Sequence, residues 1–259
     1  MRKVTKPGHP PPDGLYTSDE AAELIPVREA SARMLAVLDA WEVQHGAPME
    51  AKAVRSRFIE RLDKQRVREI LRAEQHGRCA FCEGLVTERA PASDDRRSTG
   101  MRIAHWTPIE VDRRKTLTWS NLFGSCQRQG SDAHCDVFQE SHAPPGDAPT
   151  PAEQDYGRWM RLSADGALRP GEALTPAEEA WVEALIALFN LNAERLKSAR
   201  LAAIDGLQQR LDRSRAEGRR REYKLDDLDI ELARLRGECP DVPYPTAQRL
   251  WLERRRARV

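Results

Sequence analysis

Leucine and alanine recur at every third or fourth position between charged residues over much of this chain, a spacing typical of amphipathic helices. The pattern predicts a first helix over residues 16–46, with a kink or break near Pro26 because proline cannot continue a helical hydrogen-bond ladder. It predicts a second helix over about 53–76 that ends at Gly77, since glycine readily follows a helix end.

The clearest helix start in the sequence lies further along. Thr175 is a suitable N-cap, Pro176 takes the first helical position, and Glu178 completes a capping box. Apolar spacing predicts further helices over 191–222, over 224–236 and at the basic C-terminal end. The stretch before Thr175 is rich in Pro, Gly and Asp, and it predicts loops with one short hairpin.

The middle of the chain differs from both ends, because it holds most of the cysteines and the β-prone stretches 84–89 and 101–111. The pattern therefore predicts an α+β fold that is mostly helical. We expect three parts: an N-terminal arm and helices (1–76), a small cysteine-containing module (77–142), and a linker with a C-terminal helical region (143–259).

Charge says little about partners, because 42 basic and 41 acidic side chains leave a net charge of only +1 over 259 residues. No apolar run approaches the ~20 residues that span a bilayer, so we expect no membrane association. No signal peptide is visible, and we expect a cytoplasmic protein. In that compartment thiols stay reduced, and cysteine pairs more often bind a metal than form disulfides.

Four of the five cysteines form two clusters that bracket a short segment. They are Cys79, Cys82, Cys126 and Cys135. Zinc accepts four thiolates in a tetrahedron, so the spacing predicts a structural zinc site that holds this segment together. His134 is an alternative fourth ligand, and unmetallated thiols or a redox pair are the alternative to a metal site. Cys239 is left over and is expected to be a small, partly buried side chain.

Between the two clusters lie His105, in a His–x–x–Pro strand, and Asn121, in a Trp–x–Asn–Leu loop. Asp136 directly follows the last clustered cysteine, near a predicted helix start. In chain order the motifs are CAFC, AHWTP, NLFGSC and CDVFQ. This order resembles the zinc-stabilised members of the HNH endonuclease family. The resemblance implies a small ββα-metal nuclease module with a structural zinc at the four cysteines.

The resemblance assigns three catalytic roles that the chemistry supports. His105 would be the general base, because a neutral imidazole can take a proton from water near pH 7. Asn121 would orient that ring by a hydrogen bond. Asp136 would bind one Mg²⁺ or Mn²⁺, which prefer hard oxygen ligands and would stabilise the leaving oxygen of a phosphodiester. DNA is the expected substrate, with RNA, including tRNA, as the alternative.

Three positions depart from the family pattern. Ala104 stands where an acidic residue usually precedes the histidine, Asp136 replaces the usual Asn or His, and Gln139 replaces the usual Lys. Either Glu83 or Asp136 is a candidate to supply the missing carboxylate. The alternative function is a catalytically silent zinc-binding adaptor that docks nucleic acid or an ATPase.

The flanks of the chain resemble one HNH subgroup, which includes PtuB, the nuclease subunit of Septu anti-phage systems, and some retron-associated proteins. The matching late block consists of Leu188, Asn190, Leu191, Asn192, Leu196 and Arg200. The resemblance implies a role in anti-phage defence and an ABC/SMC-like ATPase partner. The sequence shows no P-loop, so ATP dependence would have to come from another chain.

Overall fold

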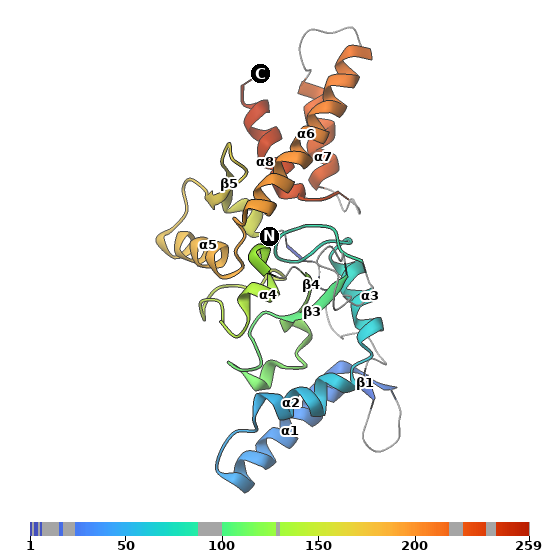
Figure 1. Ribbon diagram of the computed structural model, residues 1–259, viewed down its shortest axis with the longest axis vertical. Helices are drawn as coiled ribbons and strands as arrows, with labels where there is room; N and C mark the ends of the chain where they lie inside the picture. The colour runs from blue at the N-terminus through green and yellow to red at the C-terminus, as the bar shows by residue number, and fades with distance from the viewer. Residues whose placement is uncertain are drawn as a thin grey trace.

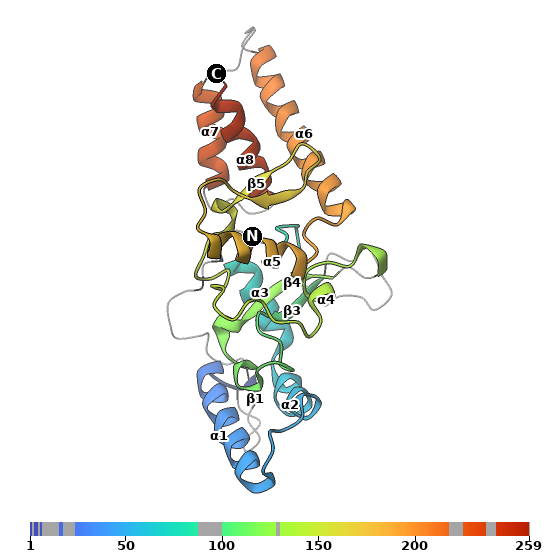
Figure 2. The same ribbon diagram turned by 90° about the vertical axis from the view of Figure 1, so that its left-hand side faces the viewer.

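The computed structural model describes residues 1, 3–4, 6, 16–17, 24–87, 100–127, 130–217, 225–236 and 242–258. Cys239 lies outside the described residues. The chain is α+β and mostly helical, as the sequence predicted. Figures 1 and 2 show an elongated molecule with α1 and α2 at one end, the β3–β4 pair in the middle and α6–α8 at the other end.

The N-terminal helices are shorter than the apolar spacing suggested. They are α1 (Val27–His45), α2 (Ala51–Phe58), the 3-10 turn η1 (Ile59–Arg61) and α3 (Lys64–Glu74). The predicted helix over 16–46 is wrong before Val27, because β1 (Tyr16–Thr17) pairs there with β2 (Leu24–Ile25). The break near Pro26 is confirmed, since Pro26 is the N-cap of α1.

The predicted continuous helix over 53–76 is also wrong, because it is interrupted at Leu62 and Asp63. Leu62 is buried in extended conformation and bridges to Tyr16. The Asp63 carboxylate then accepts a 3.0 Å hydrogen bond from the backbone N of Arg66 and starts α3 as its N-cap.

The central strands form an antiparallel pair, β3 (Met101–His105) and β4 (Leu122–Cys126), in which His105 lies opposite Leu122 and Met101 opposite Cys126. The connection between them contains two 3-10 turns, η2 (Arg113–Lys115) and η3 (Trp119–Asn121). After β4 and the 3-10 turn η4 (Gly130–Asp132), the short helix α4 begins at Asp136, at its expected place.

The C-terminal region begins with the 3-10 turn η5 (Tyr156–Arg158) and a hairpin of β5 (Met160–Leu162) with β6 (Leu168–Pro170), which confirms the short predicted hairpin. Four helices follow. They are α5 (Pro176–Leu188), α6 (Glu194–Glu217), α7 (Leu225–Arg236) and α8 (Pro245–Arg256).

One hydrophobic core runs through most of the chain, and a second small cluster joins α6, α7 and α8. At the centre of the main core the rings of Phe81 and Phe189 stack 4.3 Å apart, with Trp106 and Phe123 around them. These aromatic contacts connect the first cysteine pair to the end of α5. The division into three parts at 76 and 142 stays a prediction, since the main core contains side chains from each part.

We expect Thr175→Ala to lower the free energy of unfolding by about 1 kcal/mol, the usual worth of an N-cap. The Thr175 Oγ1 accepts from the backbone N of Glu178 at 3.3 Å, and the Glu178 carboxylate accepts from the backbone N of Thr175 at 2.8 Å. Urea denaturation measures the loss, and Thr175→Ser is the control that keeps the cap. Equal midpoints for the alanine and serine variants would contradict the expectation.

Candidate functional site

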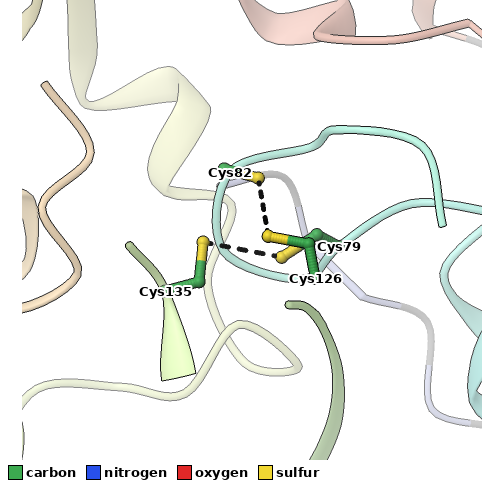
Figure 3. A group of neighbouring side chains, drawn as sticks. All are labelled: Cys79, Cys82, Cys126 and Cys135. Carbon is green, nitrogen blue, oxygen red and sulfur yellow. Dashed lines mark hydrogen bonds between the residues drawn. The ribbon is translucent and has the colours of Figure 1, made fainter. Parts of the chain in front are cut away.

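The four clustered cysteines meet at one point in the folded chain (Figure 3). Their Sγ atoms all lie within 4.8 Å of one another, and all four side chains are buried. The Sγ atoms of Cys79 and Cys135 are 3.7 Å apart, as are those of Cys82 and Cys126. Zinc–sulfur bonds of ~2.3 Å in a tetrahedron place sulfurs ~3.8 Å apart, so the group has the dimensions of a zinc site.

The cysteines come from three parts of the chain, and backbone contacts hold them in place. Between Cys79 and Cys82 the chain turns tightly, with the Cys79 backbone N donating to the Gly84 carbonyl at 2.8 Å and the Gly84 N donating to the Cys82 Sγ at 3.4 Å. Cys126 is the last residue of β4. Cys135 has a left-handed φ of 58°, and its backbone N donates to the Phe189 carbonyl at 2.8 Å.

The four buried thiols influence one another's ionisation. Burial raises the pKa of the Cys135 thiol well above its ordinary value. Hydrogen bonds from the neighbouring thiols, Cys126 foremost, hold the pKa of Cys82 well below its ordinary value. Four thiolates would repel one another in a buried site, and a divalent cation removes that cost. Because four sulfurs leave no open coordination position, the donor set fits a structural zinc.

His134, the alternative fourth zinc ligand, and Glu83, one candidate for the missing carboxylate, both lie near this centre. His134 is outside the group of four, and its Nδ1 lies 2.7 Å from the Asp132 carbonyl. Its proximity to Cys82 helps to lower the pKa of that thiol. Glu83 is buried and accepts from the Thr246 backbone N at 2.9 Å and from its Oγ1 at 2.6 Å. Glu83 thus attaches α8 to the cysteine turn and does not line the pocket that contains His105.

Residues of the late block hold the region around the cysteines together. The Asn190 Nδ2 donates to the Ala133 carbonyl at 2.9 Å, two residues before Cys135. Asn192 bonds to both the backbone N and the carbonyl of Leu168 in β6, and the buried Arg200 guanidinium donates to the Leu191 carbonyl at 2.6 Å. These side chains therefore have a structural role that their spacing alone did not reveal.

A pocket of about 520 Å³ opens where β3, α4 and the α2–α3 segment meet, and we refer to it as the polar pocket. His105, the last residue of β3, and Asp136, the first residue of α4, both line it. Its charged lining also includes Arg55, Glu60, Lys64, Arg102, Glu110 and Glu140. The structure thus brings two of the three predicted catalytic residues to one cavity.

The local contacts of His105 suit a base. Its Nε2 lies 3.0 Å from the Thr116 carbonyl oxygen, which can only accept, so Nε2 carries the proton. The neutral ring then has Nδ1 as its acceptor. Burial lowers the pKa of His105, and the nearby Asp136 only partly opposes that shift. The imidazole is therefore neutral near pH 7 and can accept a proton.

The prediction that Asn121 orients the His105 ring directly is wrong. The Asn121 Oδ1 accepts from the Thr107 backbone N at 2.8 Å, and its Nδ2 donates to the carbonyls of Thr107 and Lys115, each at 3.1 Å. These bonds hold the connection between β3 and β4, which contains the Thr116 carbonyl that fixes His105. Asn121 thus acts on the ring through the backbone of this connection.

Asp136 is held in place and paired. Its carboxylate lies 2.7 Å from the Arg102 Nε, and its backbone N donates to the Ser125 Oγ at 3.3 Å. Only 16% of the Asp136 side chain is exposed, against 42% for Arg102. Ala104 is fully buried beside β4 and does not line the polar pocket. Of the two candidates for the missing carboxylate, Asp136 alone lies in the pocket.

Sequence reasoning missed several residues of this pocket. The Thr116 carbonyl, which holds the His105 ring but is not part of the pocket lining, is a backbone atom with no sequence signal. Arg55 and Lys64 come from α2 and α3, which the predicted continuous helix did not bring near His105. Glu110, which forms an ion pair with Arg55 at 2.5 Å, follows Pro108 by two positions, and its place next to the His–x–x–Pro motif is the one signal that could have identified it.

A scan of the chain against models of known protein families finds no match. A search among curated proteins also finds no significant match. Among the described helices, none combines the length and the apolar character that crossing a bilayer requires.

Proposed function

We propose that this chain is a metal-dependent endonuclease of the HNH type that hydrolyses phosphodiester bonds, with DNA as the favoured substrate and RNA as the alternative. One observation carries the proposal: a neutral histidine with Nδ1 as its proton acceptor and a carboxylate line the same pocket, beside a four-cysteine centre. The antiparallel pair β3–β4 followed by α4 supports a ββα-metal module, because it presents these groups in the order that the family motifs require.

In this proposal His105 takes a proton from the attacking water through Nδ1. Asp136, together with acceptors from the pocket lining, would hold one Mg²⁺ or Mn²⁺, since hard cations prefer carboxylate oxygens. That ion would supply positive charge at the scissile phosphate and at the leaving oxygen. Asn121 and the Thr116 carbonyl keep the His105 ring in the required tautomer. The four cysteines would hold a zinc ion between the end of β4 and the start of α4, and so would help to position Asp136.

We also propose that the nuclease acts in anti-phage defence with an ABC/SMC-like ATPase. The resemblance of the late block and the N-terminal segment to Septu nuclease subunits supports this part. Co-purification from a host that carries the neighbouring genes tests it, with mass spectrometry of the captured proteins. Recovery of the chain without an ATPase from cells under phage infection would contradict it.

The second candidate function is the silent zinc-binding adaptor. Two observations favour it: Ala104 supplies no carboxylate, and Arg102 neutralises Asp136. The test is cleavage of supercoiled plasmid and of total tRNA in Mg²⁺ or in Mn²⁺, with and without chelator. Product that depends on the divalent ion supports the nuclease. Zinc-loaded protein that binds either nucleic acid and never cuts it supports the adaptor.

We expect Arg102→Ala to tighten Mn²⁺ binding by about 1.4- to fivefold, because a partly exposed ion pair worth ~0.2–1 kcal/mol no longer competes for Asp136. Calorimetric titration of Mn²⁺ without nucleic acid measures the change. Arg66→Ala is the matched control, since Arg66 forms an exposed ion pair with Glu69 and does not line the pocket. Mn²⁺ binding that is equally strong in Asp136→Asn and in the unaltered chain would exclude Asp136 as a ligand.

A further inference from the structure

A second groove, of about 810 Å³, adjoins the polar pocket between α4 and α5, and we refer to it as the apolar groove. Val137 and Glu140 line both cavities, so the two share a wall. The rest of the lining is mainly apolar, with Phe138, Pro145, Ala184, Ala187 and Leu188 among it. The volume falls within the ~300–1,000 Å³ typical of small-molecule sites.

Phe138 is the unusual residue of this groove, because 45% of its side chain is exposed. It lies on the four-residue helix α4, two positions after Asp136. A half-exposed aromatic ring that lines a groove gains little from the core and offers a flat surface to a ligand. Because the Phe138 ring lies beside a candidate catalytic pocket, it can contact a ligand that extends out of that pocket.

The polar atoms of the apolar groove are hydrogen-bond acceptors. The His142 Nδ1 lies 3.1 Å from the Gln139 carbonyl and must donate to it, so Nε2 is the acceptor in the neutral ring. Glu140 adds a carboxylate. None of the described lining residues is Lys or Arg, whereas Arg55, Lys64 and Arg102 all line the polar pocket. Of the two cavities, only the polar pocket offers cationic side chains to a phosphate, and the metal ion proposed at Asp136 would offset its carboxylates. The apolar groove suits an uncharged, flat group with N–H donors.

We propose that the apolar groove binds one nucleobase, stacked on Phe138, of the strand whose phosphate occupies the polar pocket. The shared wall supports this, because a base and its own phosphate are near neighbours along a strand. A base can enter the groove only when it is unpaired. The site therefore selects single-stranded nucleic acid, or a duplex with one base extruded. This inference rests on the proposed nuclease function for the phosphate side, but base binding can be measured alone.

The test uses the full-length chain with His105→Ala, so that the oligonucleotide stays intact. Fluorescence anisotropy measures binding of short single-stranded DNA and RNA, each either complete or with a series of single abasic positions. We expect Phe138→Ala to weaken binding of complete strands about tenfold, the worth of one base–aromatic stack. Phe138→Trp should restore binding and Phe138→Leu should not, which separates stacking from apolar packing. Val43→Ala, an exposed apolar truncation on α1, is the control.

One abasic position should weaken binding by the same factor and abolish the effect of Phe138→Ala. Additive effects of Phe138→Ala and the abasic position, or binding by Phe138→Leu as tight as that of the His105→Ala chain, would overturn the proposal. The groove would then be a binding site for an apolar protein segment. Base-dependent binding in a chain that never cuts would retain the base site and reject the nuclease. Cutting that needs His105 but not Phe138 or any base would retain the nuclease and reject the base site.

Discussion

We expect Cys135→Ser to prevent most zinc binding at the four-cysteine centre and to destabilise the chain on the order of 4 kcal/mol, which would lower the Tm by roughly 10 °C for a protein of this size. Loss of a metal is one of the few single changes with so large an effect. Zinc content by plasma mass spectrometry and thermal unfolding by circular dichroism measure the two results.

The size of this effect follows from what the metal would join. The four sulfurs come from the turn at Cys79 and Cys82, from the end of β4 and from the residue before α4. The Cys135 backbone is held in a left-handed conformation with a φ of 58°, which costs of order 1 kcal/mol or more for a residue with a side chain. Without the metal, buried thiols and that strained backbone remain with little to offset them.

Cys239→Ser is the matched control, because it removes the cysteine that the sequence leaves outside the two clusters. A strong zinc chelator should destabilise the unaltered chain and Cys239→Ser alike, and should have no further effect on Cys135→Ser. Zinc-free protein from zinc-supplemented cells, with the same Tm in all three chains, would exclude a structural metal.

The features that the sequence predicted well are those in which neighbouring residues carry the whole signal. The capping box at Thr175 and Glu178 lies within four residues, and α5 begins where it predicts. Two cysteine clusters with this spacing are typical of a four-ligand metal site, so they predicted one site although Cys79 and Cys135 are far apart in the chain. In both cases the hydrogen-bonding or metal-binding chemistry of a few side chains limits the local structures that can form.

The features that the sequence failed to predict depend on tertiary contacts. Apolar spacing continues across Leu62, but its buried side chain and its backbone bridge to Tyr16 favour extended backbone there and divide one predicted helix in two. That break turns α3 toward β3 and brings Lys64 to the polar pocket. Asn121 was predicted to bond to His105, but an amide side chain bonds to whichever backbone atoms the folded loop presents, and no spacing rule specifies them.

The two halves of the candidate site therefore differ in how they were found. The four-cysteine centre is specified by ligand type, and its geometry agrees with the predicted ligands. The polar pocket is specified by how β3, α4 and two N-terminal helices pack, and of the predicted catalytic residues His105 and Asp136 line it. A change at the cysteines should thus act mainly on stability, whereas a change at His105 should act mainly on the reaction.

His105→Ala should reduce cleavage by about 10²–10⁴-fold, the usual contribution of a general base, and should change the Tm little. His105→Gln sharpens the test, because its amide can still donate to the Thr116 carbonyl but cannot take a proton from water. Initial rates on supercoiled plasmid and on total tRNA, in Mg²⁺ and in Mn²⁺, measure the loss. They should be taken with and without any co-purifying ATPase.

His45→Ala is the control, since His45 is an exposed histidine of α1 that stacks on Trp41 away from the polar pocket. The pH dependence provides a second readout. Because burial lowers the pKa of His105, the base stays neutral below the ordinary imidazole value of about 6.5. The acid limb of the rate profile should therefore fall below that pH and be absent from the residual rate of His105→Gln. If the unaltered chain and both variants are equally inert with zinc bound, the carboxylate missing at Ala104 has removed catalysis and the adaptor function holds.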